Sequence, residues 1–129
     1  MSYDYKTIEV RVDGGVAVLR LNNPPVNQIS PAFRDELAAA IREALQDSAV
    51  CALVITGTGR NFMAGGDLTE LQAATDKEVL RARVLAFDEV YNGIEEGPKP
   101  AVAAINGPAL GGGLELAMAC HWRLAAEGG

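Results

Sequence analysis

The chain has 129 residues, enough for one domain with a real core, and it is 49% hydrophobic and 22% charged, as is ordinary for a globular protein. Its formal net charge of −6 argues against general nucleic-acid binding, which requires a basic face. No apolar run is long enough to cross a bilayer, and the N-terminal residues lack the pattern of a secretory signal. We therefore expect a soluble cytoplasmic protein with no membrane or nucleic-acid partner.

The first third of the chain predicts a β-hairpin followed by a helix. Residues 7–12 and 16–21 alternate or run apolar, and the Asp-Gly-Gly segment at 13–15 suits the positive φ angles of a tight turn. Ser30 predicts an N-cap, with Pro31 at the first helical position. The helix keeps one face apolar, so we expect it to pack on a sheet.

The rest of the chain alternates between predicted strands and helices. The expected elements are strands at 51–56, 101–105 and 122–126, a helix opened by a capping box at 75–78 and stopped at 97–98, and a short helix at 113–120. The strand at 51–56 is apolar throughout, which predicts burial on both faces and parallel pairing. This alternation indicates an α/β architecture with right-handed crossovers.

Two glycine-rich loops, at 57–67 and 106–115, follow predicted strands and open predicted helices. Unpaired N–H groups at a helix start bind anions, and glycine lets a ligand approach the backbone closely. Two such loops at neighbouring strand ends could hold one oxygen between two N–H groups. The simpler alternative is a pair of tight strand-to-helix connections. Neither loop matches a P-loop or a dinucleotide fingerprint, and the nucleophile elbow of serine hydrolases is absent from the sequence.

Glu115 is the one charged residue in the apolar segment 109–119, and it lies three residues after Gly112. That spacing places both residues on one helix face, so the carboxylate could reach an atom held at the Gly112 N–H. Apolar surroundings would favour its protonated form and suit it to proton transfer near neutral pH. The alternative is a glutamate at the helix start that points to water and is stabilised by the helix dipole.

Several other polar or reactive residues have simpler interpretations. Asp67 is most simply an N-cap or first-turn residue. The lone histidine, His121, and Trp122 are expected to pack, and one histidine excludes a histidine-rich metal site from this chain alone. Cys51 and Cys120 lie in apolar segments and are interpreted as free buried thiols. Isolated basic residues on a surface are usually solvated. We expect this of Arg60, Lys77, Arg81 and Arg83.

Three segments, 16–27, 53–68 and 99–120, together resemble the crotonase (enoyl-CoA hydratase/isomerase) superfamily in the right order along nearly the whole chain. The resemblance implies an α/β fold, the crotonase-like spiral of ββα units, in proteins that usually assemble as trimers or dimers of trimers. Residues 1–129 would be the N-terminal part of a single acyl-CoA-binding domain, apparently incomplete at the C-terminus. In the family, a second acid/base glutamate and the helices that complete the CoA pocket follow beyond this point.

The same resemblance assigns candidate site residues. It implies that the N–H groups of Gly66 and Gly112 hold the thioester oxygen of an acyl-CoA and that Glu115 is one acid/base residue. The CoA-binding residues would be Val26, Met63, Ala64, Gly66, Asp67 and Leu68. CoA is part of the substrate, so neither a separate cofactor nor a metal is expected.

The leading functional prediction is syn addition of water to a 2-enoyl-CoA, as in β-oxidation of fatty acids. A double-bond isomerase or another crotonase-family acyl-CoA enzyme is the enzyme alternative, and an inactive CoA-binding or assembly module is the non-enzyme alternative. Residues 120–124 also resemble the hydratase part of multifunctional β-oxidation enzymes, so the parent protein could be longer. The 129-residue chain alone is expected to be inactive. Acyl-chain specificity stays open.

Overall fold

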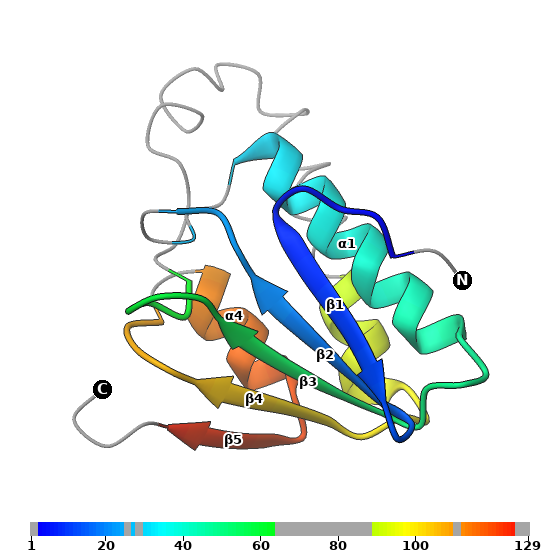
Figure 1. Ribbon diagram of the computed structural model, residues 1–129. Helices are drawn as coiled ribbons and strands as arrows, with labels where there is room; N and C mark the ends of the chain where they lie inside the picture. The colour runs from blue at the N-terminus through cyan, green and yellow to red at the C-terminus, as the bar shows by residue number, and fades with distance from the viewer. Residues whose placement is uncertain (1–2, 25–26, 28–29, 64–88, 110–111, 126–129) are drawn as a thin grey trace.

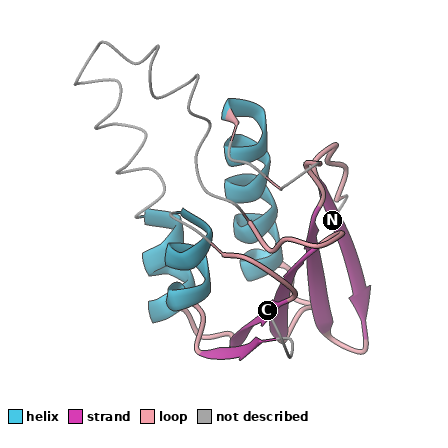
Figure 2. Cartoon of the chain, turned by 90° about the vertical axis from the view of Figure 1, so that its left-hand side faces the viewer, coloured by secondary structure: helices cyan, strands magenta, loops and turns pink. Residues whose placement is uncertain are grey.

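A computed structural model describes residues 3–24, 27, 30–63, 89–109 and 112–125. Its strands are β1 (Ile8–Asp13), β2 (Val16–Leu21), β3 (Ala52–Gly57), β4 (Ala101–Ile105) and β5 (Trp122–Ala125), and its named helices are α1 (Pro31–Gln46) and α4 (Gly112–Ala119). The strands form one five-stranded sheet in the order β1-β2-β3-β4-β5. The helices lie on one face of this sheet, which gives two layers (Figures 1 and 2).

The predicted hairpin is confirmed. β1 and β2 pair antiparallel, with Asp13 opposite Val16, so the turn between them has two residues. Gly14 and Gly15 have φ angles of 59° and 82°. Positive φ at both central positions defines the turn that matches the right-handed twist of paired strands, and glycine adopts it without steric cost.

The first helix also begins as predicted. The Ser30 hydroxyl oxygen accepts a hydrogen bond from the Phe33 N–H at 3.2 Å, and Pro31 occupies the first helical turn. The apolar face of α1 is fully buried against the sheet at Phe33, Leu37 and Ile41. α1 therefore carries much of the core on the covered face of the sheet.

β3 lies between β2 and β4 and pairs parallel with both, as predicted. Its burial differs from the prediction, because buried and half-buried residues alternate along the strand. Leu53 and Ile55 face the helices and are fully buried, whereas Val54 and Thr56 are half-buried. An apolar composition predicted burial on both faces, but the described helices cover only one.

The second half of the structure follows the predicted order. Residues 89–96 are helical, and this helix ends before Gly97 and Pro98, while Tyr91 and Ile94 on its predicted apolar stripe are buried. The capping box at 75–78 lies outside the described residues. β4 and β5 pair parallel, and every residue of β5 is exposed. Within the described part of the chain, no helix is long and apolar enough to cross a membrane.

The N-terminal segment is tied to the C-terminal half of α1 by two tyrosines. The Tyr3 hydroxyl donates to Asp47 Oδ2 at 2.6 Å, and the Tyr5 hydroxyl donates to Glu43 Oε2 at 3.0 Å. Burial raises the pKa of Tyr5 to about 12, and the hydrogen bond to Glu43 adds to the rise. Both hydroxyls therefore stay protonated donors at neutral pH, which keeps this segment on the helix.

Both cysteines are free thiols, but they differ in exposure. Cys120 is 3% exposed, which confirms the buried thiol predicted there, and burial raises its pKa to about 11. Cys51 is exposed, so the prediction of a buried thiol at that position is wrong. Cys51 lies directly before β3, and its N–H donates to the Gly15 carbonyl in the hairpin turn.

Candidate functional site

The two glycine-rich loops lie side by side beyond the carboxyl ends of β3 and β4 (Figure 1). Met63 and Ala109 form an isolated parallel bridge between the loops. The Pro108 carbonyl accepts hydrogen bonds from the N–H groups of Phe62 and Met63, at 3.1 and 3.3 Å. The predicted juxtaposition of the two loops is thus confirmed for their described residues. Parallel strands whose carboxyl ends share an edge commonly place ligand sites there.

Three glycines make this close approach possible. A Cβ atom on Gly107 would lie 1.8 Å from the Arg60 carbonyl oxygen, and one on Gly113 would lie 2.3 Å from the Met63 carbonyl oxygen. A Cβ atom on Gly57 would lie 2.2 Å from the Asn61 carbonyl oxygen. None of the three has a positive φ angle, so here glycine is required by space and not by backbone conformation.

Two asparagine side chains hold the first loop from opposite sides. Asn106, directly after β4, accepts from the Gly57 N–H through Oδ1 at 2.9 Å and donates through Nδ2 to Gly59 O and Asn61 O, at 3.2 and 3.1 Å. Asn27 is 2% exposed, and its Nδ2 lies 3.1 Å from both Asn61 O and Phe62 O. Sequence reasoning missed both residues. The sequence offered one indication of their role: Asn106 is the first residue of the second glycine-rich loop, and Asn27 also lies in a loop.

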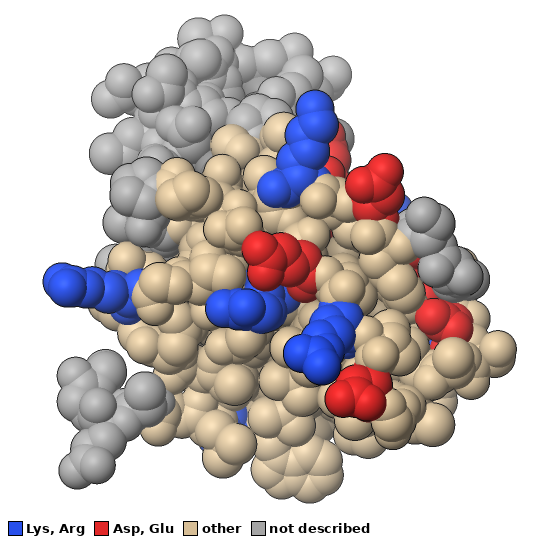
Figure 3. Space-filling view, in the orientation of Figure 1, with Lys and Arg blue, Asp and Glu red and all other residues tan. Residues whose placement is uncertain are grey.

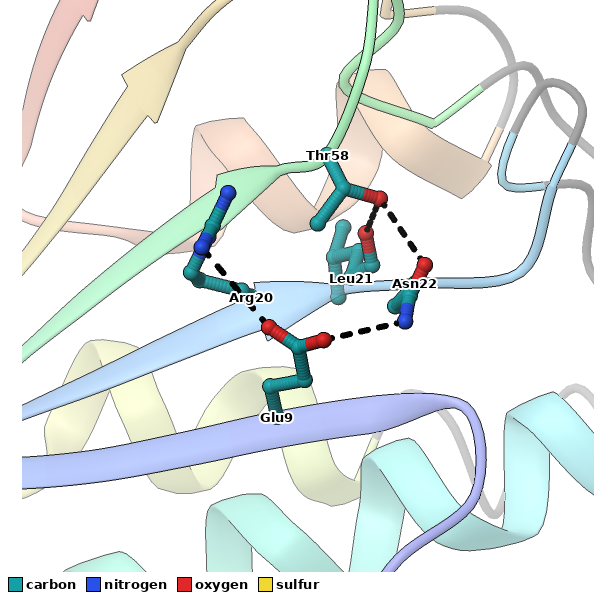
Figure 4. Close-up of polar contacts among 5 residues, drawn as sticks. All are labelled: Glu9, Arg20, Leu21, Asn22 and Thr58. Atoms are coloured by element: carbon teal, nitrogen blue, oxygen red, sulfur yellow. Dashed lines mark hydrogen bonds and ion pairs between the residues drawn. The ribbon is translucent and has the colours of Figure 1, made fainter.

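A third polar cluster joins the first loop to the outer hairpin (Figure 4). The Thr58 hydroxyl lies 2.8 Å from Leu21 O and 3.2 Å from Asn22 Oδ1, and the Thr58 N–H also donates to Leu21 O. Asn22 Nδ2 donates to Glu9 Oε1 at 3.1 Å, and Arg20 pairs with the other Glu9 oxygen at 3.7 Å. The start of the loop is therefore held against β2 as well as β4.

Gly112 and Glu115 both lie in the first turn of α4. Leu116 and Ala117 are buried against the sheet, but Glu115 is exposed, as are its apolar neighbours Leu114 and Met118, at 50% and 64%. The prediction that apolar neighbours desolvate this carboxylate is therefore not met in the described chain. Those neighbours are apolar, but they are themselves exposed, so Glu115 faces solvent, as in the alternative that the sequence left open.

The remaining predicted site residues are only partly described. Met63 is fully buried at the bridge between the loops, where its carbonyl and Cβ adjoin Gly113. Val26, Ala64, Gly66, Asp67 and Leu68 lie outside the described residues. The same holds for Lys77, Arg81 and Arg83, whereas Arg60 is exposed, as expected of a solvated side chain.

His121 and Trp122 follow α4 and behave differently. His121 Nδ1 accepts from the Ala101 N–H at 2.9 Å, so Nε2 carries the proton and donates to Glu95 O at 3.1 Å. This histidine links the start of β4 to the end of the helix at 89–96, but it is exposed, so the prediction that it packs is not met. Trp122 is 63% exposed, so the prediction that it packs in the core is wrong for this chain.

Acidic and basic side chains are interspersed on the face of the molecule seen in Figure 3. Among the described residues, no group of three or more histidine, cysteine or acidic side chains is arranged to hold a metal.

An α/β fold with two interlocked glycine-rich loops at one sheet edge places the chain among enzymes of the crotonase fold. Residues 11–128 match the family model described as enoyl-CoA hydratase/isomerase, and the chain belongs to that family. It is 45% identical over 123 residues to a probable enoyl-CoA hydratase of Bacillus subtilis. It is 46% identical over 125 residues to a glyoxysomal fatty acid β-oxidation multifunctional protein of Brassica napus.

These comparisons also show how much of each relative the chain spans. It covers 46% of the B. subtilis protein and 17% of the B. napus protein, with 93% and 95% of its own length aligned. The crystal structure of an enoyl-CoA hydratase from Bacillus anthracis superimposes with a TM-score of 0.84 at 35% identity, over 95% of this chain and 48% of that one. The chain thus spans about half the length of a single-function relative.

Proposed function

We propose that the protein is an enoyl-CoA hydratase, which adds water syn across the double bond of a 2-enoyl-CoA thioester. The observation that carries this proposal is the bridge between Met63 and Ala109. Each bridged residue precedes by three positions a glycine proposed as an oxyanion donor, Gly66 in one loop and Gly112 in the other. Two loops locked together in this way favour two N–H groups acting on a single oxygen.

The proposed chemistry proceeds through an enolate. The oxygen of water bonds to the β-carbon while one of its O–H bonds breaks and the proton passes to an acid/base side chain, which can later return a proton to the α-carbon. The π electrons move toward the thioester, and the negative charge gathers on the thioester oxygen. Backbone N–H groups of Gly66 and Gly112 stabilise that oxygen most strongly in the transition state, which is what accelerates the reaction. The enolate then takes a proton at the α-carbon, and the electron pair of the enolate forms the new C–H bond.

Glu115 is proposed as one proton-transfer residue. It lies one helical turn after Gly112, so the two share a face of α4. Its exposure leaves the carboxylate accessible to a substrate bound at the loop edge. The CoA portion is proposed to contact Val26 and the stretch from Met63 to Leu68, by the family resemblance.

Replacing Glu115 with glutamine in the full-length protein tests the proposal. We expect kcat for hydration of crotonyl-CoA to fall by about 10² or more, the usual scale for a positioned acid or base, while CoA affinity barely changes. Glu96→Gln is the matched control, because it removes the same charge from an exposed site at the end of the helix at 89–96. Near-wild-type turnover by Glu115→Gln would overturn the assignment.

The product distinguishes the two enzyme classes within the family. Reaction in deuterated water followed by NMR should yield a 3-hydroxyacyl-CoA that carries one deuteron at the α-carbon. A 3-enoyl-CoA with no gain of oxygen would instead assign the protein to the double-bond isomerases. Absence of any product, with CoA still bound, would favour a binding module.

A further inference from the structure

Asn106 connects the two loops directly. It belongs to the loop after β4, yet its side chain forms hydrogen bonds with backbone groups at the end of β3 and in the loop that follows, at Gly57, Gly59 and Asn61. Its oxygen accepts one N–H and its two amide protons serve two carbonyls, so the side chain is satisfied by one partner loop. Any shift of that loop relative to β4 must break these bonds.

Asn27 meets the same loop from another segment. Its Nδ2 lies 3.1 Å from Asn61 O and 3.1 Å from Phe62 O, and its Oδ1 accepts from the Asn23 N–H at 2.8 Å. It has a φ angle of 55°, a conformation that asparagine tolerates better than most residues. The carbonyl of Asn61 therefore accepts from both asparagine amides, one for each lone pair.

The backbone that the Asn27 and Asn106 amides hold leads directly into the bridge between the two loops. Asn61 and Phe62 immediately precede Met63, whose partner Ala109 follows Asn106 by three residues. From the bridge, three further residues lead to Gly66 on one chain segment and to Gly112 on the other. The pairing of Met63 with Ala109 therefore fixes the two chain positions from which the segments to Gly66 and Gly112 begin.

We propose that Asn27 and Asn106 are positioning residues that set the separation between the two oxyanion-binding N–H groups. This inference rests on the proposed function, because it concerns the same thioester oxygen. Neither asparagine is proposed to touch the substrate. Their effect is expected on the developing negative charge and not on the binding of CoA, since an oxyanion site misplaced by a fraction of an ångström loses transition-state stabilisation first.

The test uses the full-length protein and four variants. Asn106→Ala removes every contact of that amide, and Asn106→Asp retains an oxygen for the Gly57 N–H but removes both donors. Asn27→Gly removes the buried amide while keeping a residue that tolerates positive φ. The matched control is Asn92→Ala, because Asn92 is an exposed asparagine on the helix at 89–96, outside both loops.

Two measurements distinguish a loss of oxyanion positioning from a general loss of stability. One is kcat and KM for crotonyl-CoA, with thermal unfolding recorded for each variant. The other is the infrared carbonyl stretch of a bound 2-enoyl-CoA thioester, which shifts to lower frequency when N–H groups polarise the oxygen. We expect kcat to fall about 10- to 100-fold in the Asn27 and Asn106 variants, with CoA affinity within about twofold and the carbonyl shift reduced. Asn92→Ala should retain both wild-type kcat and the wild-type carbonyl shift.

The outcomes distinguish failure of this inference from failure of the proposed function. If the wild-type protein does not shift the carbonyl band, the oxyanion proposal itself is wrong. If the wild-type protein shifts it and folded Asn27 and Asn106 variants shift it equally, with unchanged kcat, the positioning role is refuted. Should Asn106→Ala fail to fold, Asn106→Asp decides the question, because it keeps the bond to the start of the loop.

Discussion

At the scale of single residues, the contact between the two loops depends on glycines, which have no side chain. Gly107 and Gly113 approach opposing backbone carbonyls so closely that an added methyl group requires one backbone to move. We expect Gly107→Ala and Gly113→Ala each to lower the free energy of unfolding by about 3 kcal/mol, at the upper end of the range for overpacked sites, because backbone yields less readily than a side chain. Chemical denaturation measures the loss.

Gly93→Ala provides the control for this substitution. Gly93 is exposed in the helix at 89–96, and a Cβ atom there would meet only Leu45 Cδ1, at 4.0 Å. Alanine is the better helix former, so this variant should gain about 0.5–1 kcal/mol. Equal destabilisation by Gly93→Ala and Gly107→Ala would show that the close carbonyl contact does not determine the loss in the free energy of unfolding.

Sequence patterns single out residues of unusual type, as candidates for chemistry, more readily than the residues that hold a loop in place. Glycines and a lone carboxylate stand out because their types are unusual in their surroundings, and this marked Gly112 and Glu115. Asn27 and Asn106 are common loop residues, and their roles depend on carbonyls more than thirty positions away in sequence. The exposure of Glu115 matches the alternative that the sequence left open and not the leading prediction, because apolar neighbours along a helix do not tell which of them face the core.

At the scale of elements, Glu36 joins the N-terminal segment to the first helix. Its carboxylate accepts from the Lys6 and Thr7 N–H groups, each at 2.8 Å, and from the Thr7 hydroxyl. Burial alone would raise the pKa of Glu36, but these hydrogen bonds favour the ionised form and the net effect is a lowered pKa. The carboxylate is thus more readily ionised in the folded chain than in the unfolded one.

A lowered pKa stabilises the fold above the unfolded value of 4.5, and the contribution is lost as pH falls through the folded value. Glu36→Gln should therefore unfold more readily than wild type at pH 7, and the difference should narrow below about pH 4. Urea denaturation at several pH values measures this. Asp35→Asn is a suitable control, since that neighbouring side chain is 81% exposed and lies 4.0 Å from the Arg34 guanidinium. A difference that does not depend on pH would contradict the argument.

Elements with a strong local signal were predictable. The Asp-Gly-Gly turn and the Ser-Pro helix start have local causes, and both appear where they were expected. The burial of β3 and the exposure of β5 were not predictable in the same way. Both depend on which faces of the sheet are covered, and hydrophobic composition alone does not contain that information.

At the scale of the whole molecule, large apolar side chains are left exposed on α4 and β5. Leu114, Met118, Trp122 and Leu124 are 50–66% exposed. Exposed apolar surface of this kind drives association in water. We expect residues 1–129, expressed by themselves, to self-associate, and Trp122→Lys with Leu124→Lys to reduce that association. Light scattering after gel filtration measures it, and a monodisperse monomer at micromolar concentration would contradict the prediction.

The strand order of the sheet is the order in which a ribosome would release the strands. β3 joins β2 already paired with β1, then β4 joins β3, and β5 joins β4. Each strand therefore meets a finished edge when it emerges, and no earlier strand has to wait for a later one to reach its partner. During synthesis the described sheet can grow outward from the hairpin, with β1 staying at one edge while each new strand covers the edge opposite to it.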